Sequence, residues 1–190
     1  MTVAVRAATP EDASSIAEVA LRAWEVGFRG IVPAEIDAGL AWNRERVRAR
    51  LSERDRETDH LVAELDGRVM GYLVLGPSRD RDAPPRVGEI WALYVHPEAW
   101  RRGLGRALVR HVLAELREAG CEVVTLWTLA DSPSARAFYE ACGFVQDGAT
   151  QRREALGNPV EVRYRRSVSA QGSPSLRRGR QRSRKLRCLR

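Results

Sequence analysis

Two glycines and three arginines lie within six residues near the middle of the chain, in the order Arg101-Arg102-Gly103-Leu104-Gly105-Arg106. An apolar, aromatic run precedes them and a run with helical spacing follows, so they lie where a strand turns into a helix. Free amides at a helix start attract anions, and glycines let phosphates approach the backbone closely. Arginines add charge-assisted donors. The segment therefore predicts a binding site for a phosphate-bearing ligand, most simply a pyrophosphate.

Two glycines at this spacing are a weak signal when taken alone. No Gly-Lys-Ser/Thr follows them, which excludes a P-loop, and Arg106-Ala107-Leu108 supplies no third glycine or alanine where a dinucleotide-binding motif needs one. The alternative is an ordinary helix that has Gly103 near its first turn.

Metal chemistry has no support in the sequence. The three cysteines, Cys121, Cys142 and Cys188, form no CxxC pair and no His/Cys spacing that would build a zinc site. We therefore expect no metal.

The elements that would position the anion site alternate between strands and helices. Asp66-Gly67 between two strand-like runs predicts a hairpin. A stripe of Leu104, Leu108, Val112 and Leu116 predicts a buried helix face. The expected strands are 3–6, 60–66, 68–75, 89–95, 121–129, 144–149 and 160–166, and the expected helices are 10–27, 33–54 (one helix or two), 103–119 and 133–141. This order predicts an α/β fold with a mixed sheet flanked by helices.

Composition limits the class of protein. The chain has 190 residues, 44% of them hydrophobic and 30% charged, which suits one globular domain. No apolar run is long enough for a membrane span, and the first residues lack the apolar core of a signal peptide. We therefore expect a cytoplasmic protein with no membrane partner.

The net charge of +7 is unevenly distributed. Residues 167–190 hold eight Lys/Arg and no acid, whereas residues 1–166 hold 24 basic and 25 acidic side chains. We therefore expect a domain at 1–166 and a basic, disordered tail at 167–190. Such a tail suits a polyanion such as nucleic acid, although coding bias or a nonfunctional extension explains it equally well.

Two segments resemble the GNAT superfamily of acetyl-CoA-dependent N-acetyltransferases. The run from Trp100 to Gly105 is similar to its coenzyme motif, Gln/Arg-x-x-Gly-x-Gly/Ala, with Trp100 replacing the first polar residue. The run from Ser132 to Phe144 is similar to its late motif, Asn-x-x-Ala-x-x-Phe-Tyr-Glu-x-x-Gly-Phe, with Ser132 replacing Asn. The resemblance covers about residues 3–166.

The resemblance implies a three-layer fold whose mixed, mostly antiparallel sheet has six to seven strands and about four flanking helices. Its strands near 89–95 and 122–129 splay apart, and the pantetheine arm of acetyl-CoA lies in the gap. The implied coenzyme-binding residues are Leu93, Tyr94, Val95, Arg101, Arg102, Gly103, Leu104, Gly105, Arg106 and Ser132.

The resemblance also implies catalytic roles. Tyr139 occupies the position that protonates the departing CoA sulfur, and Glu89 precedes Trp100 by the interval at which the histone acetyltransferase branch carries its base. Trp24, Phe28 and Arg29 lie in the segment that covers the acceptor, or they simply belong to the core.

The expected function is transfer of an acetyl group from acetyl-CoA to a primary amine, by direct attack, with a small-molecule acceptor favoured. Two alternatives stay open: acetylation of a protein N-terminus or lysine, and CoA binding without transfer combined with a polyanion-binding tail. Nucleic acid is not expected as a partner except through that tail, and either a monomer or a homodimer is compatible.

Overall fold

The computed structural model describes residues 1–33, 42–52 and 58–168. Within these residues the chain forms one seven-stranded sheet in the order β1-β2-β3-β4-β5-β7-β6. The strands are β1 (Val3–Ala7), β2 (Asp59–Leu65), β3 (Arg68–Pro77), β4 (Val87–Val95), β5 (Val123–Leu129), β6 (Val145–Arg152) and β7 (Val160–Ser167). The described α-helices are α1 (Ala13–Gly27), α3 (Arg44–Ser52), α4 (Leu104–Glu118) and α5 (Pro133–Ala141).

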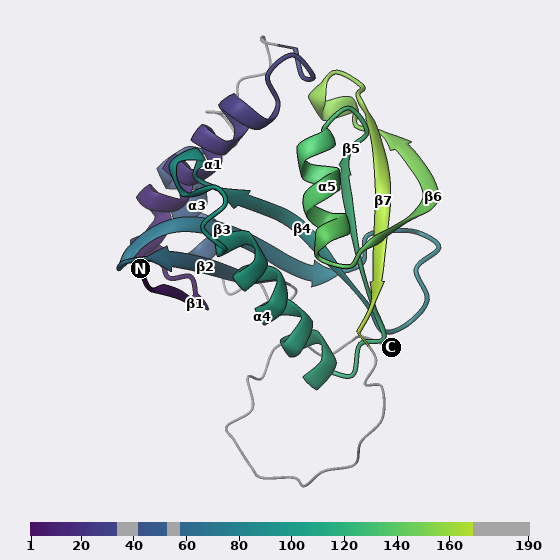
Figure 1. Cartoon of the computed structure of the whole chain (residues 1–190), viewed down its shortest axis with the longest axis horizontal. Coiled ribbons are helices and arrows are strands. Elements are labelled where there is room, and N and C mark those ends of the chain that lie inside the picture. Colours follow the sequence, from purple (N-terminus) through teal and green to yellow (C-terminus); the bar gives the residue numbers. More distant parts are fainter. Residues whose placement is uncertain (34–41, 53–57, 169–190) are drawn as a thin grey trace, which may run out of the picture.

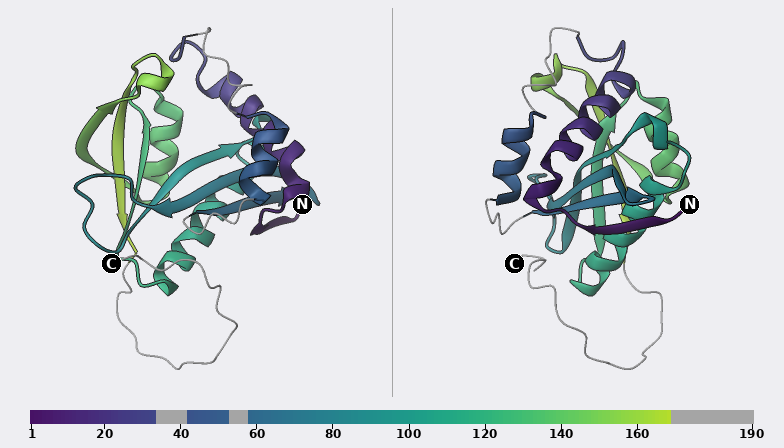
Figure 2. Two further views of the ribbon diagram at one scale, coloured as in Figure 1. Left: turned by 180° about the vertical axis from the view of Figure 1, so that it is seen from behind. Right: turned by 90° about the vertical axis from the view of Figure 1, so that its left-hand side faces the viewer.

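The sheet separates two layers of helices, which confirms the three-layer expectation (Figures 1 and 2). Helices α1 and α3 lie on one side, here called the α1 face, and α4 and α5 lie on the other, the α4 face. Neighbouring strands are antiparallel, apart from the parallel pair β4–β5. Each face buries its own apolar cluster, so the sheet is covered on both sides near β2 and β3.

Local sequence explains these elements. Asp66 and Gly67 have φ angles of 49° and 81°, as a two-residue hairpin turn requires, and they join paired residues Leu65 and Arg68. Helix α4 buries the predicted stripe of Leu104, Leu108, Val112 and Leu116, each at most 1% exposed. Helix α1 begins one turn later than predicted because Pro10–Asp12 form a 3-10 turn.

Strands β4 and β5 pair only at their first residues. The parallel register runs from Val87↔Val123 to Ile90↔Leu126 and then stops. Beyond Ile90, β4 keeps β3 as a neighbour and β5 keeps β7, so the two strands diverge toward the top of Figure 1. A register shift between β3 and β4 at Val74/Leu75 accompanies the divergence. Such a bulge increases local twist, and the result is an opening in the sheet between Trp91–Val95 and the end of β5.

Two boundaries differ from the expectation. Of the helix predicted over 33–54, the structure describes α3 with Val47 buried, whereas Ile36 and Leu40 lie outside the described residues. At the other end β7 includes Ser167, and Val168 is 2% exposed with its amide bonded to Glu122 O at 2.9 Å. The described fold thus extends two residues beyond the expected end of the domain.

Candidate active site at the opening between β4 and β5

The free edge of β4 supplies backbone groups to the opening. The amide of His96 donates to Met70 O on β3 at 2.9 Å. Backbone groups of alternate residues in an antiparallel pair point to the same neighbour, so Tyr94 also faces β3 and Leu93 and Val95 face the other edge. In the part of the chain that the structure describes, no strand pairs with that edge. Backbone groups of this kind need partners, and an amide-bearing ligand can supply them.

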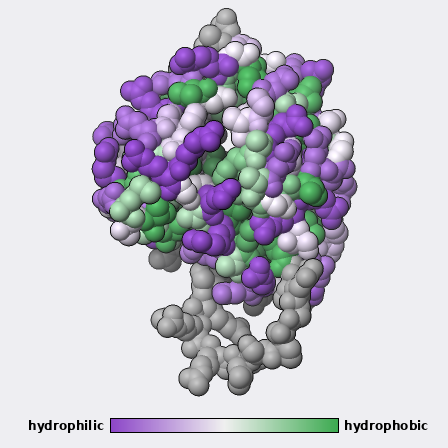
Figure 3. Space-filling view, viewed as in Figure 1, coloured by the Kyte–Doolittle hydropathy of each residue, from purple (hydrophilic) through white to green (hydrophobic). Residues whose placement is uncertain are grey.

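Trp100 already forms a hydrogen bond with one of these backbone groups. Its indole Nε1 donates to the carbonyl oxygen of Val95 at 2.7 Å, while 44% of the residue stays exposed. Where the family motif has Gln or Arg, this chain therefore uses an indole to tie the end of β4 to the turn before α4. The opening lies among apolar side chains visible near the centre of an otherwise mostly hydrophilic surface (Figure 3).

The start of α4 offers unpaired donors. Gly103 caps the helix at φ 88°, a left-handed conformation that glycine adopts without strain. Among the described residues, no acceptor is found for the amides of Gly103, Leu104, Gly105 and Arg106. With the helix dipole, these four donors are suited to an anion, and the phosphate site expected from the sequence stays a prediction.

The two glycines of the motif have different roles. A Cβ on Gly103 would meet no atom within 4 Å, so that position is open to a ligand. A Cβ on Gly105 would lie 3.0 Å from the ring of Phe138, so this glycine lets α4 pack closely against α5. Leu104 is 1% exposed and its side chain belongs to the core. Only its backbone amide is available to a coenzyme.

The remaining predicted coenzyme residues surround this helix start or lie near it. Arg101, Arg102 and Arg106 are exposed, and Arg101 has a φ of 60°. Ser132 caps α5 and is 7% exposed, yet its hydroxyl makes no hydrogen bond to a described residue. Tyr94 lies on β4 between Leu93 and Val95, and its side chain packs on the α1 face, 5.1 Å from the ring of Trp42.

Tyr139 lies on α5 in an aromatic cluster with Phe138, Phe144 and Tyr164. The residue is 8% exposed, and burial raises the pKa of its phenol well above the usual value. Tyr94 is a secondary electrostatic cause of the raised pKa of Tyr139, although the two side chains pack on opposite faces of the sheet. The Tyr139 hydroxyl has no hydrogen-bond partner in the described part of the chain. It stays protonated and available to a leaving group.

Glu89 is fully buried and bound to Arg79. Ile90 belongs to the α4-face cluster, so alternation along β4 puts Glu89 on the α1 face. Its Oε2 accepts the Arg79 backbone amide at 2.7 Å, and its Oε1 accepts Arg79 Nε at 3.1 Å and Nη2 at closer range. Arg79 also stacks over Trp91 at 4.5 Å. Arg79 could not be identified as this partner from the sequence, because it lies in an irregular loop.

That loop, residues 78–86, is fixed to the far strands. Arg163 on β7 pairs with Asp80 at 2.9 Å, with Asp82 at 3.2 Å and with Asp147 at 2.8 Å. Trp127 on β5 donates to Asp80 at 2.8 Å. These contacts hold Arg79, and through it Glu89, at the closed end of the opening.

The residues proposed for the acceptor side are only partly brought together. Trp24 and Phe28 stack at 4.4 Å near the end of α1. Arg29 is exposed and lines a groove along α1 and the β2–β3 hairpin with His96 and Glu98. The ring of Trp42 lies 5.1 Å from the ring of Tyr94, which belongs to β4. Among these aromatic residues, Trp42 is therefore the one with a described contact to the strand that borders the opening.

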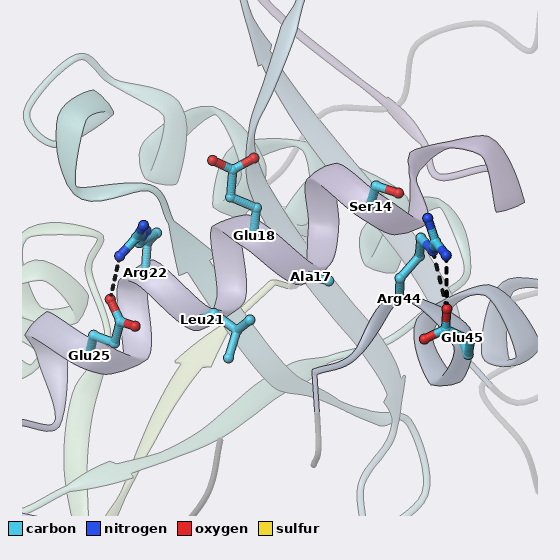
Figure 4. A pocket seen from close by; sticks show the side chains of 8 residues that line it. All are labelled: Ser14, Ala17, Glu18, Leu21, Arg22, Glu25, Arg44 and Glu45. Atoms are coloured by element: carbon cyan, nitrogen blue, oxygen red, sulfur yellow. Dashed lines mark hydrogen bonds and ion pairs between the residues drawn. The ribbon is translucent and has the colours of Figure 1, made fainter. Parts of the chain in front are cut away.

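A second groove lies between α1 and the start of α3. It is lined by Ser14, Ala17, Glu18, Leu21, Arg22, Glu25, Arg44 and Glu45 (Figure 4). Arg22 pairs with Glu25 at 2.9 Å and Arg44 with Glu45 at 3.0 Å, so its charges largely satisfy one another. Neither groove is lined by Glu89, Tyr139 or residues 101–106. We therefore place the candidate site at the β4–β5 opening.

Within residues 1–33, 42–52 and 58–168, no group of three or more His, Cys, Asp or Glu side chains could hold a metal ion. In the same ranges no helix is long and apolar enough to cross a membrane.

Known proteins share this architecture and sequence. The mycothiol acetyltransferase of Sanguibacter keddieii is 37% identical over 140 residues, covering 64% of this chain and 44% of that protein, so the chain spans less than half of that relative. An uncharacterized N-acetyltransferase of Bacillus subtilis, YuaI, is 30% identical over 139 residues, covering 73% of this chain and 78% of that protein.

Among solved structures, the PaiA N-acetyltransferase from Thermoplasma acidophilum, in complex with coenzyme A, superposes with a TM-score of 0.70 at 18% identity. It covers 86% of this chain and 98% of that one, which shows a common fold. The model of the acetyltransferase (GNAT) family matches residues 20–144, about two thirds of the chain, and includes the opening, the start of α4 and all of α5. The chain belongs to the acetyltransferase (GNAT) family.

Proposed function

We propose that this protein transfers the acetyl group of acetyl-CoA to a primary amine of a small molecule. The observation that carries the proposal is the divergence of β4 and β5 beside a helix start with four unpaired amides. The amides would hold the pyrophosphate, and the free edge at Leu93 and Val95 would bond the pantetheine arm. The acetyl group then reaches the opening from the α4 face, and the amine approaches from the α1 face.

Three groups have separate catalytic roles in this proposal. The amide of Leu93 polarises the thioester carbonyl as the amine attacks it. The C–N bond forms, the C–S bond breaks, and Tyr139 gives its proton to the departing thiolate. Glu89 takes the proton that the amine loses, and it does so from within its pair with Arg79.

The relatives support a small acceptor. Several similar proteins are named mycothiol acetyltransferases, and the name describes a low-molecular-weight thiol. The coenzyme-A complex of the Thermoplasma enzyme supports the choice of donor.

Release of free CoA tests the proposal. The protein is mixed with acetyl-CoA and separately with glucosamine, spermidine, an amino acid amide, and peptides with a free N-terminus or a lysine. At least one small amine should accelerate thiol release well above hydrolysis. Acceleration by peptides alone would contradict the small-molecule acceptor. Absence of acetyl-CoA binding by calorimetry would contradict the proposal as a whole.

A further inference from the structure

Glu161 is a buried carboxylate that none of the proposed steps uses. It lies on β7, opposite Leu129 of β5 and Gln151 of β6, and it is 7% exposed. It lies outside residues 20–144, the part matched by the family model. A carboxylate is seldom buried to this degree unless it is paired.

The partners of Glu161 satisfy one of its two oxygens. Oε2 accepts Gln151 Nε2 at 2.7 Å and lies 3.9 Å from Arg153 Nη1. Among the residues that the structure describes, Oε1 has no hydrogen-bond or ion-pair partner. Only 9% of the side chain is exposed. This oxygen is not among the fully buried atoms that lack a partner, so it remains accessible to water or to a ligand that carries a donor.

The position of Glu161 relates this oxygen to the opening. Val162 and Tyr164 pack in the α4-face cluster, so alternation along β7 puts Glu161 on the α1 face. Its strand neighbour Leu129 ends β5, beyond the point where β5 leaves β4. Glu161 therefore lies beside the open end of the gap, on the side opposite the proposed coenzyme site.

Tyr94 lies across the gap from Glu161. Burial raises the pKa of Tyr94 to about 12, and the charge of Glu161 adds to that rise, whereas Arg153 and Arg50 oppose it. Tyr94 follows Leu93, whose amide is proposed to meet the thioester. Glu161 and Tyr94 therefore lie on the same face of the sheet, on either side of the β4–β5 opening.

The other carboxylates described near this part of the α1 face are held by arginines at shorter distances. Glu89 is bound by Arg79 through both oxygens, and Asp80, Asp82 and Asp147 share Arg163. Glu161 differs from them because its nearest cation lies at 3.9 Å and its Oε1 remains unpaired.

We infer that Glu161 binds the ammonium form of the acceptor through Oε1 and positions it at the opening, so that the acceptor is a cationic primary amine. The inference rests on the proposed function, in which the bound amine is the acceptor of the acetyl group. Aromatic rings of Tyr94 and Trp42 form an adjoining wall that suits the carbon skeleton of such an amine. The bound ammonium gives one proton to Glu89 before attack. The second proton leaves the nitrogen after the C–N bond forms and restores the Tyr139 phenol that has protonated the thiolate. Glu161 therefore acts as a substrate-positioning group and not as the base.

Binding of ethylammonium tests the inference without any transfer. The full chain, saturated with CoA and labelled with ¹³C at glutamate carboxyl carbons, is titrated with ethylammonium chloride. The Glu161 resonance is assigned by its loss in Glu161→Gln. The Glu161 resonance should shift saturably with ethylammonium concentration. Potassium chloride of equal ionic strength should not shift it, and ethylammonium should not shift the resonance of the exposed Glu118 in this way. An unmoved Glu161 resonance would overturn the inference, even if acetyl transfer were demonstrated.

Kinetics with any amine that the CoA-release assay identifies give the second readout. Glu161→Gln keeps the shape and a hydrogen bond to Gln151, so the melting temperature and acetyl-CoA affinity should stay close to wild type. The KM for the amine should rise about 30-fold or more, since a buried charge pair is lost. The matched variant Glu118→Gln should change neither. An unchanged KM for the amine in Glu161→Gln would overturn the inference.

Discussion

Arg79 holds both carboxylate oxygens of Glu89, with its backbone amide at 2.7 Å from Oε2 and its Nε at 3.1 Å from Oε1. The carboxylate is fully buried, whereas 40% of the arginine side chain is exposed. The pair therefore connects the closed end of the β4–β5 opening to the loop that Arg163 anchors. A base at this position acts under the influence of a permanent positive charge, and the same pair also orders the loop.

The two roles of Glu89 can be separated by a pair of variants. Glu89→Gln should lower kcat at neutral pH by about 10²-fold or more, and the loss should shrink as pH rises and the amine deprotonates unaided. Arg79→Met removes the charge beside the carboxylate and loosens the same loop, but it keeps the base, so its loss of kcat should not show the recovery at high pH expected of Glu89→Gln. Equal losses in both variants at every pH would make Glu89 a structural residue.

Tyr139→Phe should lower kcat with little change in acetyl-CoA affinity, as expected for a proton donor that acts in the transition state. Because burial raises the pKa of Tyr139, the wild-type enzyme should lose no activity through its ionisation below about pH 10. The hydroxyl has no partner among the described residues, so thermal stability should hold.

Tyr164→Phe is the matched control for that variant. It removes a hydrogen bond of 2.7 Å to Glu140 and one of 3.2 Å from Arg136. Its melting temperature should fall while its kcat is largely kept. A Tyr139→Phe enzyme with wild-type kcat would assign the proton donation to another group.

Gly103→Glu should weaken acetyl-CoA binding strongly, because it adds a negative charge to the anion site where a ligand would lie. Gly67→Glu controls for backbone strain and charge, since Gly67 has φ 81° and equally open surroundings in the β2–β3 hairpin. Calorimetry should show normal affinity for the Gly67 variant. Similar losses in both variants would mean that destabilisation explains the effect and would remove the α4 start from the coenzyme site.

Glu115→Gln should stabilise the protein at neutral pH. Glu115 Oε2 is buried without a partner among the described residues, and desolvation by burial raises the pKa of the carboxyl. When folding raises the pKa of a carboxyl group, its ionisation destabilises the folded state at pH values above the pKa of the unfolded state. At lower pH the group is protonated in both states and this cost is absent. The gain should be about 1 kcal/mol, or a few degrees in Tm, at pH 7.

That gain should disappear as the pH approaches 4. Glu118→Gln, an exposed change on the same helix, should leave Tm unchanged at both pH values. Scanning calorimetry over this range checks the sign, and a gain that is independent of pH would exclude the buried charge as its cause.

Much of the fold could be predicted from local patterns. The Asp66-Gly67 turn specifies the β2–β3 hairpin through its backbone conformation. The apolar stripe of α4 specifies a helix with one buried face. Both features depend on residues that are close together in the sequence. The strand order could not be obtained in this way. It depends on β7 pairing with β5 across the sequence of α5 and β6, a long-range contact that no local pattern encodes.

The candidate site divides in a similar way. Gly103, Gly105 and Tyr139 belong to contiguous motifs, so the sequence could indicate them. Arg79 and Glu161 could not be identified as site residues from the sequence, because the proposed role of each depends on contacts with a residue on another element. Tyr94 is implied in coenzyme binding by the family resemblance alone, and strand alternation directs its side chain to the α1 face.

Amide hydrogen exchange at β4, with and without acetyl-CoA, tests the central claim most directly. If the pantetheine arm bonds the free edge in the β4–β5 opening, the amides of Leu93 and Val95 should exchange at least about tenfold more slowly in the complex, corresponding to roughly 1.4 kcal/mol of protection. The amide of Tyr94, which faces β3, serves as an internal control and should change little. Calorimetrically saturated protein in which Leu93 and Val95 exchange at the unbound rate would contradict the account.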